Sequence, residues 1–203
     1  MASVYDLKPR FQSLLRPLMG RLAGLGLTAN SLTVLAAVGS MVVGAIVGFA
    51  REPALLLLLP AWLFVRMALN ALDGMMAREL GMKSNLGAML NEVGDVVSDL
   101  SLYLPLAVVR REALWPVLAF SIGAVLTELC GVLGQALGAG RQYQGPMGKS
   151  DRAFLVGALA LATAMRPNVV AGWPWIFAAA SALAAWTCLR RCRAALATAR
   201  AAR

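Results

Sequence analysis

The amino-acid sequence predicts an all-α integral membrane protein, on the basis of its composition, the length of its apolar runs and the placement of its basic residues. Apolar residues make up 60% of the 203 positions and the mean hydropathy is +0.70, whereas a soluble domain is usually about 45–50% apolar. A helix that crosses a bilayer needs about 20 mainly apolar residues. Six stretches meet this requirement, near residues 30–50, 53–77, 86–108, 113–137, 153–170 and 172–190.

The segment before these spans has a different character. Residues 1–27 mix charged and apolar side chains and contain no continuous apolar run of the kind that marks a cleavable signal. We interpret them as an amphipathic helix that lies on the membrane surface, with a solvated tail as the alternative. Leucines would enter the lipid and basic side chains would face lipid phosphates: Leu14, Leu15 and Leu18 on one side, and Lys8, Arg10, Arg16 and Arg21 on the other.

The remaining elements follow in order along the chain. Residues 28–190 are expected to form a six-helix bundle and residues 191–203 a basic cytoplasmic tail, so that 1–203 make one membrane domain. The short polar link after the second span makes the second and third spans antiparallel neighbours. The fifth span is the least regular, because Arg166 and Pro167 interrupt it near its end.

Basic residues are distributed unevenly between the two sides of this bundle. Fourteen of them lie on the side of the amino terminus and four on the opposite side. The positive-inside rule therefore predicts that both termini are cytoplasmic. The net charge of +9 then marks a surface that faces anionic lipid and not a nucleic-acid binder. The fourteen are Lys8, Arg10, Arg16, Arg21, Arg78, Lys83, Arg141, Lys149, Arg152, Arg190, Arg191, Arg193, Arg200 and Arg203, and the four are Arg51, Arg110, Arg111 and Arg166.

Acidic and amide side chains gather in the second and third spans, where a bilayer makes charge costly. Two polar faces result on a helical wheel: Arg66, Asn70 and Asp73 on the second span, and Asn91, Asp95 and Asp99 with Glu92 at the edge on the third. Such groups can simply hydrogen-bond one helix to another. So many carboxylates would repel one another, however, unless a cation neutralises them. Oxygen ligands, in a chain without histidine, favour Mg²⁺ or Mn²⁺ over zinc.

Glycine and arginine add a second element to this pattern. Gly74 and Gly87 let a backbone approach a bulky ligand closely, although tight helix packing is an alternative role. Arg78 follows Gly74 by one turn and offers a fork of donors to a phosphate. Carboxylates, a cation, close-approach glycines and an arginine together suit a nucleotide diphosphate.

The same stretch resembles the signature of the class-I CDP-alcohol phosphatidyltransferase family, D-x-x-D-G-x-x-A-R, eight residues, then G-x-x-x-D-x-x-x-D. All the gaps match. The matching residues are Asp73, Gly74, Ala77, Arg78, Gly87 and Asp95, and Asn70 and Asn91 stand at the positions of the first and third aspartates. The similarity extends to the six-helix plan, to the amphipathic segment and to the LTANSLT sequence before the first span. It is greatest to an enterobacterial inner-membrane branch of that family.

The resemblance implies an activity and roles for these positions. It implies an enzyme of the bacterial inner membrane, a homodimer, that transfers a phosphatidyl group from a CDP-alcohol, usually CDP-diacylglycerol, to an acceptor alcohol and releases CMP. Asn70, Asp73, Asn91 and Asp95 would stand at the ligand positions for one or two Mg²⁺ or Mn²⁺ ions, and Gly74, Ala77, Arg78 and Gly87 would receive the cytidine nucleotide. Asp95, or Asp99 in its place, would accept the proton of the attacking hydroxyl.

The sequence departs from the family signature at two aspartates. Asn70 and Asn91 stand in their places, and an amide keeps a carbonyl oxygen for a metal but gives up the charge. Glu92 and Asp99 lie close enough along the helix to supply charge from shifted positions. One ion, two ions with altered ligands, or none are therefore all open.

The connection between the fourth and fifth spans, GAGRQYQGPMGKSDRAF, carries basic residues on the predicted cytoplasmic side. Arg141, Lys149 and Arg152 are either part of the ordinary positive-inside belt or a pocket for a phosphate of the donor or acceptor. Glu128, within the fourth span, is expected to pair with Arg66 or to face the site.

The sequence thus predicts a membrane-embedded phosphotransferase whose active site faces the cytoplasm. Two other functions remain open. A family member with two asparagines in its motif could bind a CDP-lipid or an anionic lipid without turnover. A small carrier or channel could line an ion path with these acids, although the glycine and arginine spacing disfavours it. The sequence does not identify the acceptor.

Overall fold

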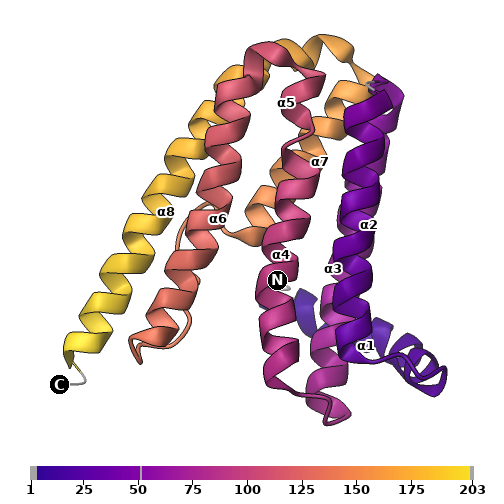
Figure 1. Ribbon diagram of the computed structural model, residues 1–203, viewed down its shortest axis with the longest axis vertical. Helices are drawn as coiled ribbons and strands as arrows, with labels where there is room; N and C mark the ends of the chain where they lie inside the picture. The colour runs from indigo at the N-terminus through magenta and orange to yellow at the C-terminus, as the bar shows by residue number, and fades with distance from the viewer. Residues whose placement is uncertain (1–3, 51, 202–203) are drawn as a thin grey trace.

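The computed structural model describes residues 4–50 and 52–201, and within these ranges all the regular structure is helical. Figure 1 shows long helices that run roughly side by side and meet most closely at one end. The main helices are α1 (Val4–Gly24), α2 (Ala29–Ala50), α3 (Leu58–Glu79), α4 (Asn85–Tyr103), α6 (Leu114–Ala136), α7 (Lys149–Met165) and α8 (Trp173–Ala201). Short elements join them: η1 (Pro53–Leu57), α5 (Leu106–Val109), η2 (Arg111–Ala113) and η3 (Pro167–Gly172).

In the described part of the chain, four helical segments are long and apolar enough to cross a membrane: Ala29–Ala50, Pro53–Glu79, Arg111–Ala136 and Pro167–Ala201. They agree with the first, second, fourth and sixth predicted spans. The third and fifth predicted spans correspond to α4 and α7, which do not meet these criteria. The reason is physical, because α4 carries Glu92, Asp95 and Asp99, and α7 has only 17 residues and begins with Lys149.

The last helix extends further than the sequence predicts. The segment predicted as a basic tail does not leave the last helix at residue 190, because α8 continues to Ala201 and buries Arg191 and Ala195. The amino-terminal segment is helical as expected, since α1 runs from Val4 to Gly24. Its Leu14 is exposed, and Arg16 donates to Glu79 at the end of α3 over 3.0 Å. Its position on a membrane surface stays a prediction.

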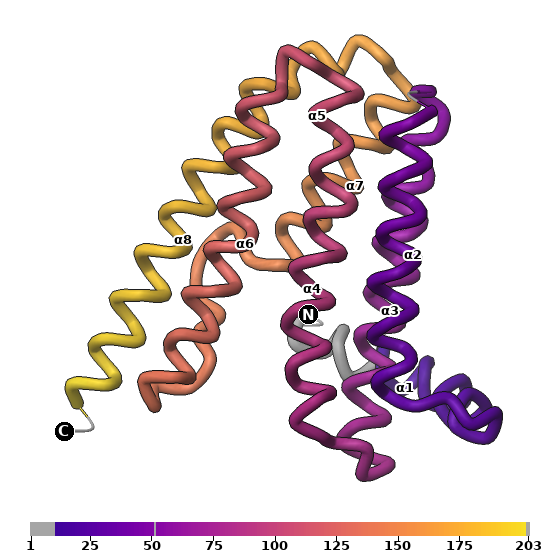
Figure 2. Tube along the Cα trace, in the orientation of Figure 1, coloured from indigo at the N-terminus to yellow at the C-terminus, as the bar shows by residue number. Residues whose placement is uncertain are grey.

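Aromatic packing holds the helices together at the end away from α1. The rings of Tyr103, Phe120, Phe177 and Trp173 form a row of edge-to-face and tilted contacts, with successive centroids 5.2, 5.3 and 5.9 Å apart. Such contacts contribute about 0.5–1.5 kcal/mol each beyond burial. From this row, α6 and α8 run together away from α2, α3 and α4, as the trace in Figure 2 shows.

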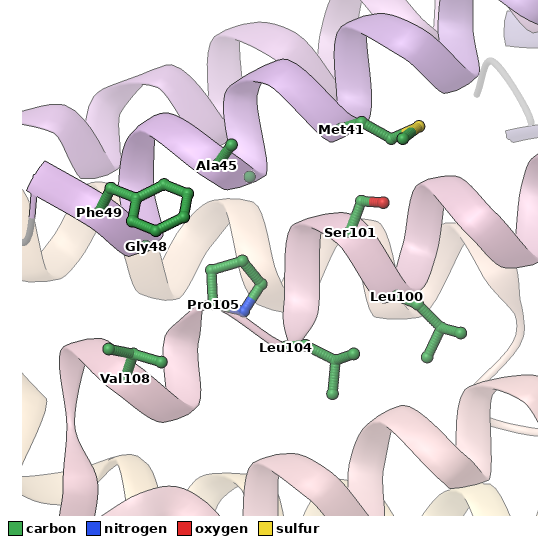
Figure 3. Close-up of a pocket in the computed structure, with 10 residues that line it drawn as sticks. Met41, Ala45, Gly48, Phe49, Leu100, Ser101, Leu104, Pro105 and Val108 are labelled. Carbon is green, nitrogen blue, oxygen red and sulfur yellow. The ribbon is translucent and has the colours of Figure 1, made fainter.

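Helix α2 packs against both α3 and α4. Gly44 makes the second contact possible, because a Cβ there would collide with the carbonyl of Ser101 on α4. An apolar pocket of about 640 Å³ lies along this contact. Figure 3 shows its lining, where Ala45, Gly48 and Phe49 of α2 lie opposite Ser101 and Pro105. Helix α3 also contacts α7, and α4 contacts α6, so α4 lies between the two halves of the molecule.

Candidate active site

A polar pocket of about 1170 Å³ lies where α3 ends and α4 begins. The start of α2, the last turns of α3, the first turns of α4 and the end of α6 all contribute to its walls. In Figure 1 these segments lie at the lower end of the bundle, the same end as α1 and the last turns of α8. The pocket includes eight of the predicted site positions: Asn70, Asp73, Gly74, Ala77, Arg78, Gly87, Asn91 and Arg141.

Helix α3 contributes a face of the pocket with one polar residue per turn. Asn70 and Asp73 lie one turn apart, as the predicted ligand spacing requires. Asp73 is buried and accepts a hydrogen bond from the Thr33 hydroxyl of α2 over 2.8 Å. The same hydroxyl donates weakly to the carbonyl of Ala29 at 3.1 Å. This contact fixes the Oδ2 oxygen of Asp73 against α2.

Gly74 and Gly87 both sit where a side chain would meet a neighbour. A Cβ at Gly74 would lie 3.2 Å from Nη1 of Arg78, which folds back along α3 towards it. A Cβ at Gly87 would lie 2.7 Å from Oδ1 of Asn30 on α2. Ser84 also caps α4 here, because its hydroxyl accepts the N–H of Gly87 over 2.9 Å. The glycines therefore keep the helix ends close and leave the Arg78 guanidinium in the pocket wall.

Helix α4 carries its three motif-side residues at increasing depth. Asn91 lines the pocket, while Asp95 and Asp99, one and two turns further, are buried. Asp95 and Asp99 both contact Arg66 of α3: Nη1 of Arg66 lies 2.6 Å from Asp99, and Nη2 lies 3.4 Å from Asp95 and 3.2 Å from its carbonyl. The polar faces of α3 and α4 thus meet as the sequence predicts, and the link is an ion pair.

The ion pair between α3 and α4 belongs to a longer row in which acidic and basic side chains alternate. Each member contacts the next across α3, α4, α6, α7 and the loop before α7. In order, the row runs Glu92, Arg141, Glu128, Arg152, Asp99, Arg66, Asp95 and Lys149. We call it the charge row. Four members are acidic and four are basic, so it neutralises itself within the protein.

The three predicted phosphate-binding residues occupy different places in this row. Arg141 lines the pocket and contacts Glu92 and Glu128. Lys149, at the start of α7, reaches Asp95 over 2.5 Å. Arg152 is 0% exposed, and its Nη2 contacts Asp99 at 3.0 Å.

Glu128 completes this part of the row, because its Oε1 lies 2.8 Å from Nη2 of Arg152. Of the two expectations for Glu128, pairing with Arg66 is not what the structure shows, since its partners are Arg152 and Arg141.

Helix α8 anchors the loop that carries Arg141. Arg191 donates through Nε to the carbonyl of Gln144 over 3.2 Å and through Nη1 to the carbonyl of Thr127. Thr187 accepts the N–H of Met147 over 3.1 Å. Gly145 has a φ of +121° and packs its backbone against the Thr187 side chain, where a Cβ would collide. The loop is therefore held by a helix that the sequence analysis did not connect to the site.

The residues of the pocket fit one divalent cation of the Mg²⁺ or Mn²⁺ type. Asp73, Asn70 and Asn91 present oxygen donors in the same pocket, and such hard donors suit these metals. Among the ion pairs of the described residues, none involves Asp73, so its charge is available. Within residues 4–50 and 52–201, no group of three or more acidic or cysteine side chains is arranged to hold a metal alone. Amide oxygens and the substrate would have to complete the ligand set.

Two residues of the site, and one contact between residues already named, were not predicted from the sequence. Asn30 and Thr33 line the pocket, and their only sequence signal is a polar pair three residues apart in LTANSLT. Glu128 and Arg152 are paired although they lie 24 positions apart. Local spacing carries no information about such a contact.

The fold and the pocket together define a class of membrane protein. Residues 26–188 match the model of the CDP-alcohol phosphatidyltransferase family, and the chain belongs to that family. Among its relatives is the inner membrane protein YnbA of Escherichia coli (strain K12), which is 45% identical over 194 residues that cover 96% of each chain.

Solved structures share the fold. Phosphatidylinositol phosphate synthase PgsA1 of Mycobacterium tuberculosis, crystallised with CDP-DAG bound, matches 88% of this chain and 92% of its own with a TM-score of 0.75 and 19% identity. The same enzyme in complex with manganese and citrate matches 89% of this chain and 88% of its own, with a TM-score of 0.75 and 22% identity. At this identity the similarity establishes the common fold.

Proposed function

We propose that the protein is a phosphatidyltransferase that moves a phosphatidyl group, a substituted phosphate, from CDP-diacylglycerol or a related CDP-alcohol to the hydroxyl of an acceptor. The observation that carries the proposal is the single pocket that Asn70, Asp73, Gly74, Arg78 and Gly87 share. These residue types suit a nucleotide diphosphate. The membership of the family and the CDP-DAG bound to PgsA1 support the choice of donor.

The residues of α3 and the start of α4 would bind the donor. Arg78 offers a planar fork of N–H donors to a phosphate, and Gly74 and Gly87 leave room for the nucleotide. Asp73, with the oxygens of Asn70 and Asn91, would hold Mg²⁺ or Mn²⁺. When bound, such a cation supplies positive charge against the diphosphate of the donor. The acyl chains would remain in the bilayer.

Asp95 is our choice for the group that receives the proton from the acceptor. In the transfer, the acceptor oxygen forms a bond to the β-phosphorus, the bond from that phosphorus to the CMP oxygen breaks, and the hydroxyl proton moves to a carboxylate. Asp99 is the less suitable carboxylate, because Arg66 and Arg152 contact both of its oxygens and it lies one turn deeper than Asp95. We assign Asp99 to the positioning of these two arginines.

The acceptor would enter beside the loop before α7. Arg141 lines the pocket and Lys149 is partly exposed next to Asp95, so both can approach a phosphate or a hydroxyl-rich group. Arg152 is fully buried and would support them through the charge row. The acceptor can be identified by measuring CMP release with a panel of alcohols.

We further propose that all six long helices after α1 cross the inner membrane, with both termini and the pocket on the cytoplasmic side. The helix ends that line the pocket lie at the same end of the bundle as α1 and the last turns of α8 (Figure 1), which supports this arrangement. Ion pairs to Arg66, Lys149 and Arg152 lower the cost of placing the acidic residues of α4 inside the membrane. A homodimer, expected from the resemblance, stays a prediction.

A second candidate function is the binding of a CDP-lipid or an anionic lipid without turnover. Asn70 and Asn91 favour it, because they withhold two charges that the family signature places in the site. The same pocket would then regulate or present lipid.

The test is release of CMP by the purified protein in detergent with CDP-diacylglycerol, Mg²⁺ or Mn²⁺ and a panel of alcohols that includes phosphorylated polyols. We expect release with at least one acceptor and a loss of about 100-fold or more in Asp73→Ala, which removes the unpaired carboxylate of the pocket. Glu112→Ala, at the opposite end of the molecule, is the matched control and should keep full activity. Binding of the CDP-lipid without release by a folded protein would favour the second function, and neither binding nor release would contradict both.

A further inference from the structure

Asp95 lies between two basic side chains of this chain. Nζ of Lys149 is 2.5 Å from its Oδ1, and Nη2 of Arg66 is 3.4 Å from the same oxygen. The carboxylate is buried and the lysine side chain is 33% exposed. At these distances in a half-buried site, the two cations neutralise the carboxylate strongly.

The two asparagines lie on either side of this pair. Asn70 is one turn along α3 from Arg66, and Asn91 is one turn before Asp95 on α4. Aspartates at both positions would add two negative charges, enough to neutralise one divalent cation. Their replacement by amides removes the charge that a second ion beside Asp95 would require.

The other acids near the pocket are also neutralised by the protein. Glu92 contacts Arg141, and Asp99 contacts Arg66 and Arg152. Among the described acidic residues of the pocket and the charge row, Asp73 has no ion pair. The protein therefore leaves one carboxylate for a metal, on the α3 side.

We propose that Lys149, supported by Arg66, takes the place of a second divalent cation beside Asp95, so that the site holds one ion, at Asp73. The inference rests on the proposed function only for the donor diphosphate that would share this ion. Lys149 is the first residue of α7 and approaches from the side of the loop that carries Arg141. It therefore brings a basic side chain to the side of the site that the acceptor enters.

The experiment counts Mn²⁺ bound per chain from the electron paramagnetic resonance signal of free Mn²⁺. The full-length protein is measured in detergent with CDP-diacylglycerol, and the same micelles without protein are subtracted. Four forms are compared: wild type, Asn70→Asp with Asn91→Asp, this double variant with Lys149→Gln, and the double variant with Lys83→Gln. Lys83 is an exposed cation that lines the same pocket and is the matched control.

We expect one Mn²⁺ per wild-type chain and a weak second ion in the double variant. Adding Lys149→Gln should tighten the second ion by about tenfold or more, because a positive charge next to it is removed. Adding Lys83→Gln should change it by less than about twofold. Two ions in the wild type, no ion in the wild type, or equal effects of the two lysine changes would each overturn the proposal. CMP release is measured on the same samples, so that one bound ion without turnover would contradict the proposed function alone.

Discussion

At the residue scale, Arg78 shows how a single side chain is prepared for its ligand by its neighbour. Its guanidinium lies against the backbone at Gly74, where even a methyl group would come within 3.2 Å. Arg78 is exposed at the pocket wall, so its planar fork is available. A fork of this kind binds a phosphate through two parallel N–H donors, which a lysine cannot reproduce.

We therefore expect Arg78→Ala to raise the KM for CDP-diacylglycerol by about tenfold or more, and Arg78→Lys to restore only part of the loss. Lys83→Ala removes another exposed cation of the same pocket and should change the KM by less than about twofold. The measurement is the dependence of CMP release on donor concentration. Full recovery with lysine, or an equal effect of Lys83→Ala, would mean that local charge alone is recognised.

At the element scale, the loop between α6 and α7 depends on contacts that no single helix can provide. Arg191 reaches the carbonyls of Gln144 and Thr127, and Thr187 accepts the N–H of Met147. Arg191 is buried although it is one of four arginines near the end of α8, and its neighbour Arg190 is exposed. Because Arg190 and Arg191 carry the same charge, comparing the two distinguishes the effect of the buried contacts from the effect of losing a positive charge.

Replacing Arg191 by alanine should loosen the loop, because the backbone carbonyls of Gln144 and Thr127 lose a charged donor. Hydrogen bonds from charged groups contribute about 1.5–3 kcal/mol each, so the Tm in detergent should fall by about 5 °C or more. The loop that carries Arg141 should also become more sensitive to protease. Arg190→Ala is the matched control and should leave both properties unchanged. A similar loss of Tm in the two variants would show that the carbonyl contacts contribute little.

Most of the helical plan was predictable from the sequence because it depends on local properties. Apolar runs such as 30–50 and 113–137 mark their helices to within a few residues of Ala29–Ala50 and Leu114–Ala136. The motif spacing likewise placed Asp73 and Gly87 in one pocket, since helical periodicity decides which side chains share a face.

The charge row was not predictable in the same way. Contacts such as Arg152 to Asp99, 53 positions apart, are decided by which helices pack together. The continuation of α8 through residues 191–201 was not predictable either, because the basic residues there indicate a cytoplasmic tail and do not show that the helix continues and buries Arg191 and Ala195.

At the scale of the whole molecule, the proposed orientation places the loop between α3 and α4 in the cytoplasm and the segment between α5 and α6 outside. In a variant whose three cysteines are replaced by serine, we expect Ser84→Cys to react with a membrane-impermeant maleimide only after the inner membrane is opened. Glu112→Cys should react in intact spheroplasts. Labelling of intact spheroplasts is compared with labelling of lysed spheroplasts. Reaction at both positions from the same side would contradict the arrangement.

The charge row also has a consequence for the order in which the chain is assembled. During synthesis α4 leaves the ribosome before α7, and at that stage Arg66 is the member of the row available to Asp95 and Asp99 from an earlier helix. An unpaired charge at the centre of a bilayer costs about 2.5–3.5 kcal/mol on the insertion scale. Helix α4 should therefore reach its full depth only when α7 arrives with Lys149 and Arg152. The carboxyl-terminal half of the chain thus completes the insertion of the amino-terminal half. In a nascent chain that stops before α7, the acidic residues of α4 would lack the partners Lys149 and Arg152, and their insertion into the bilayer would be unfavourable.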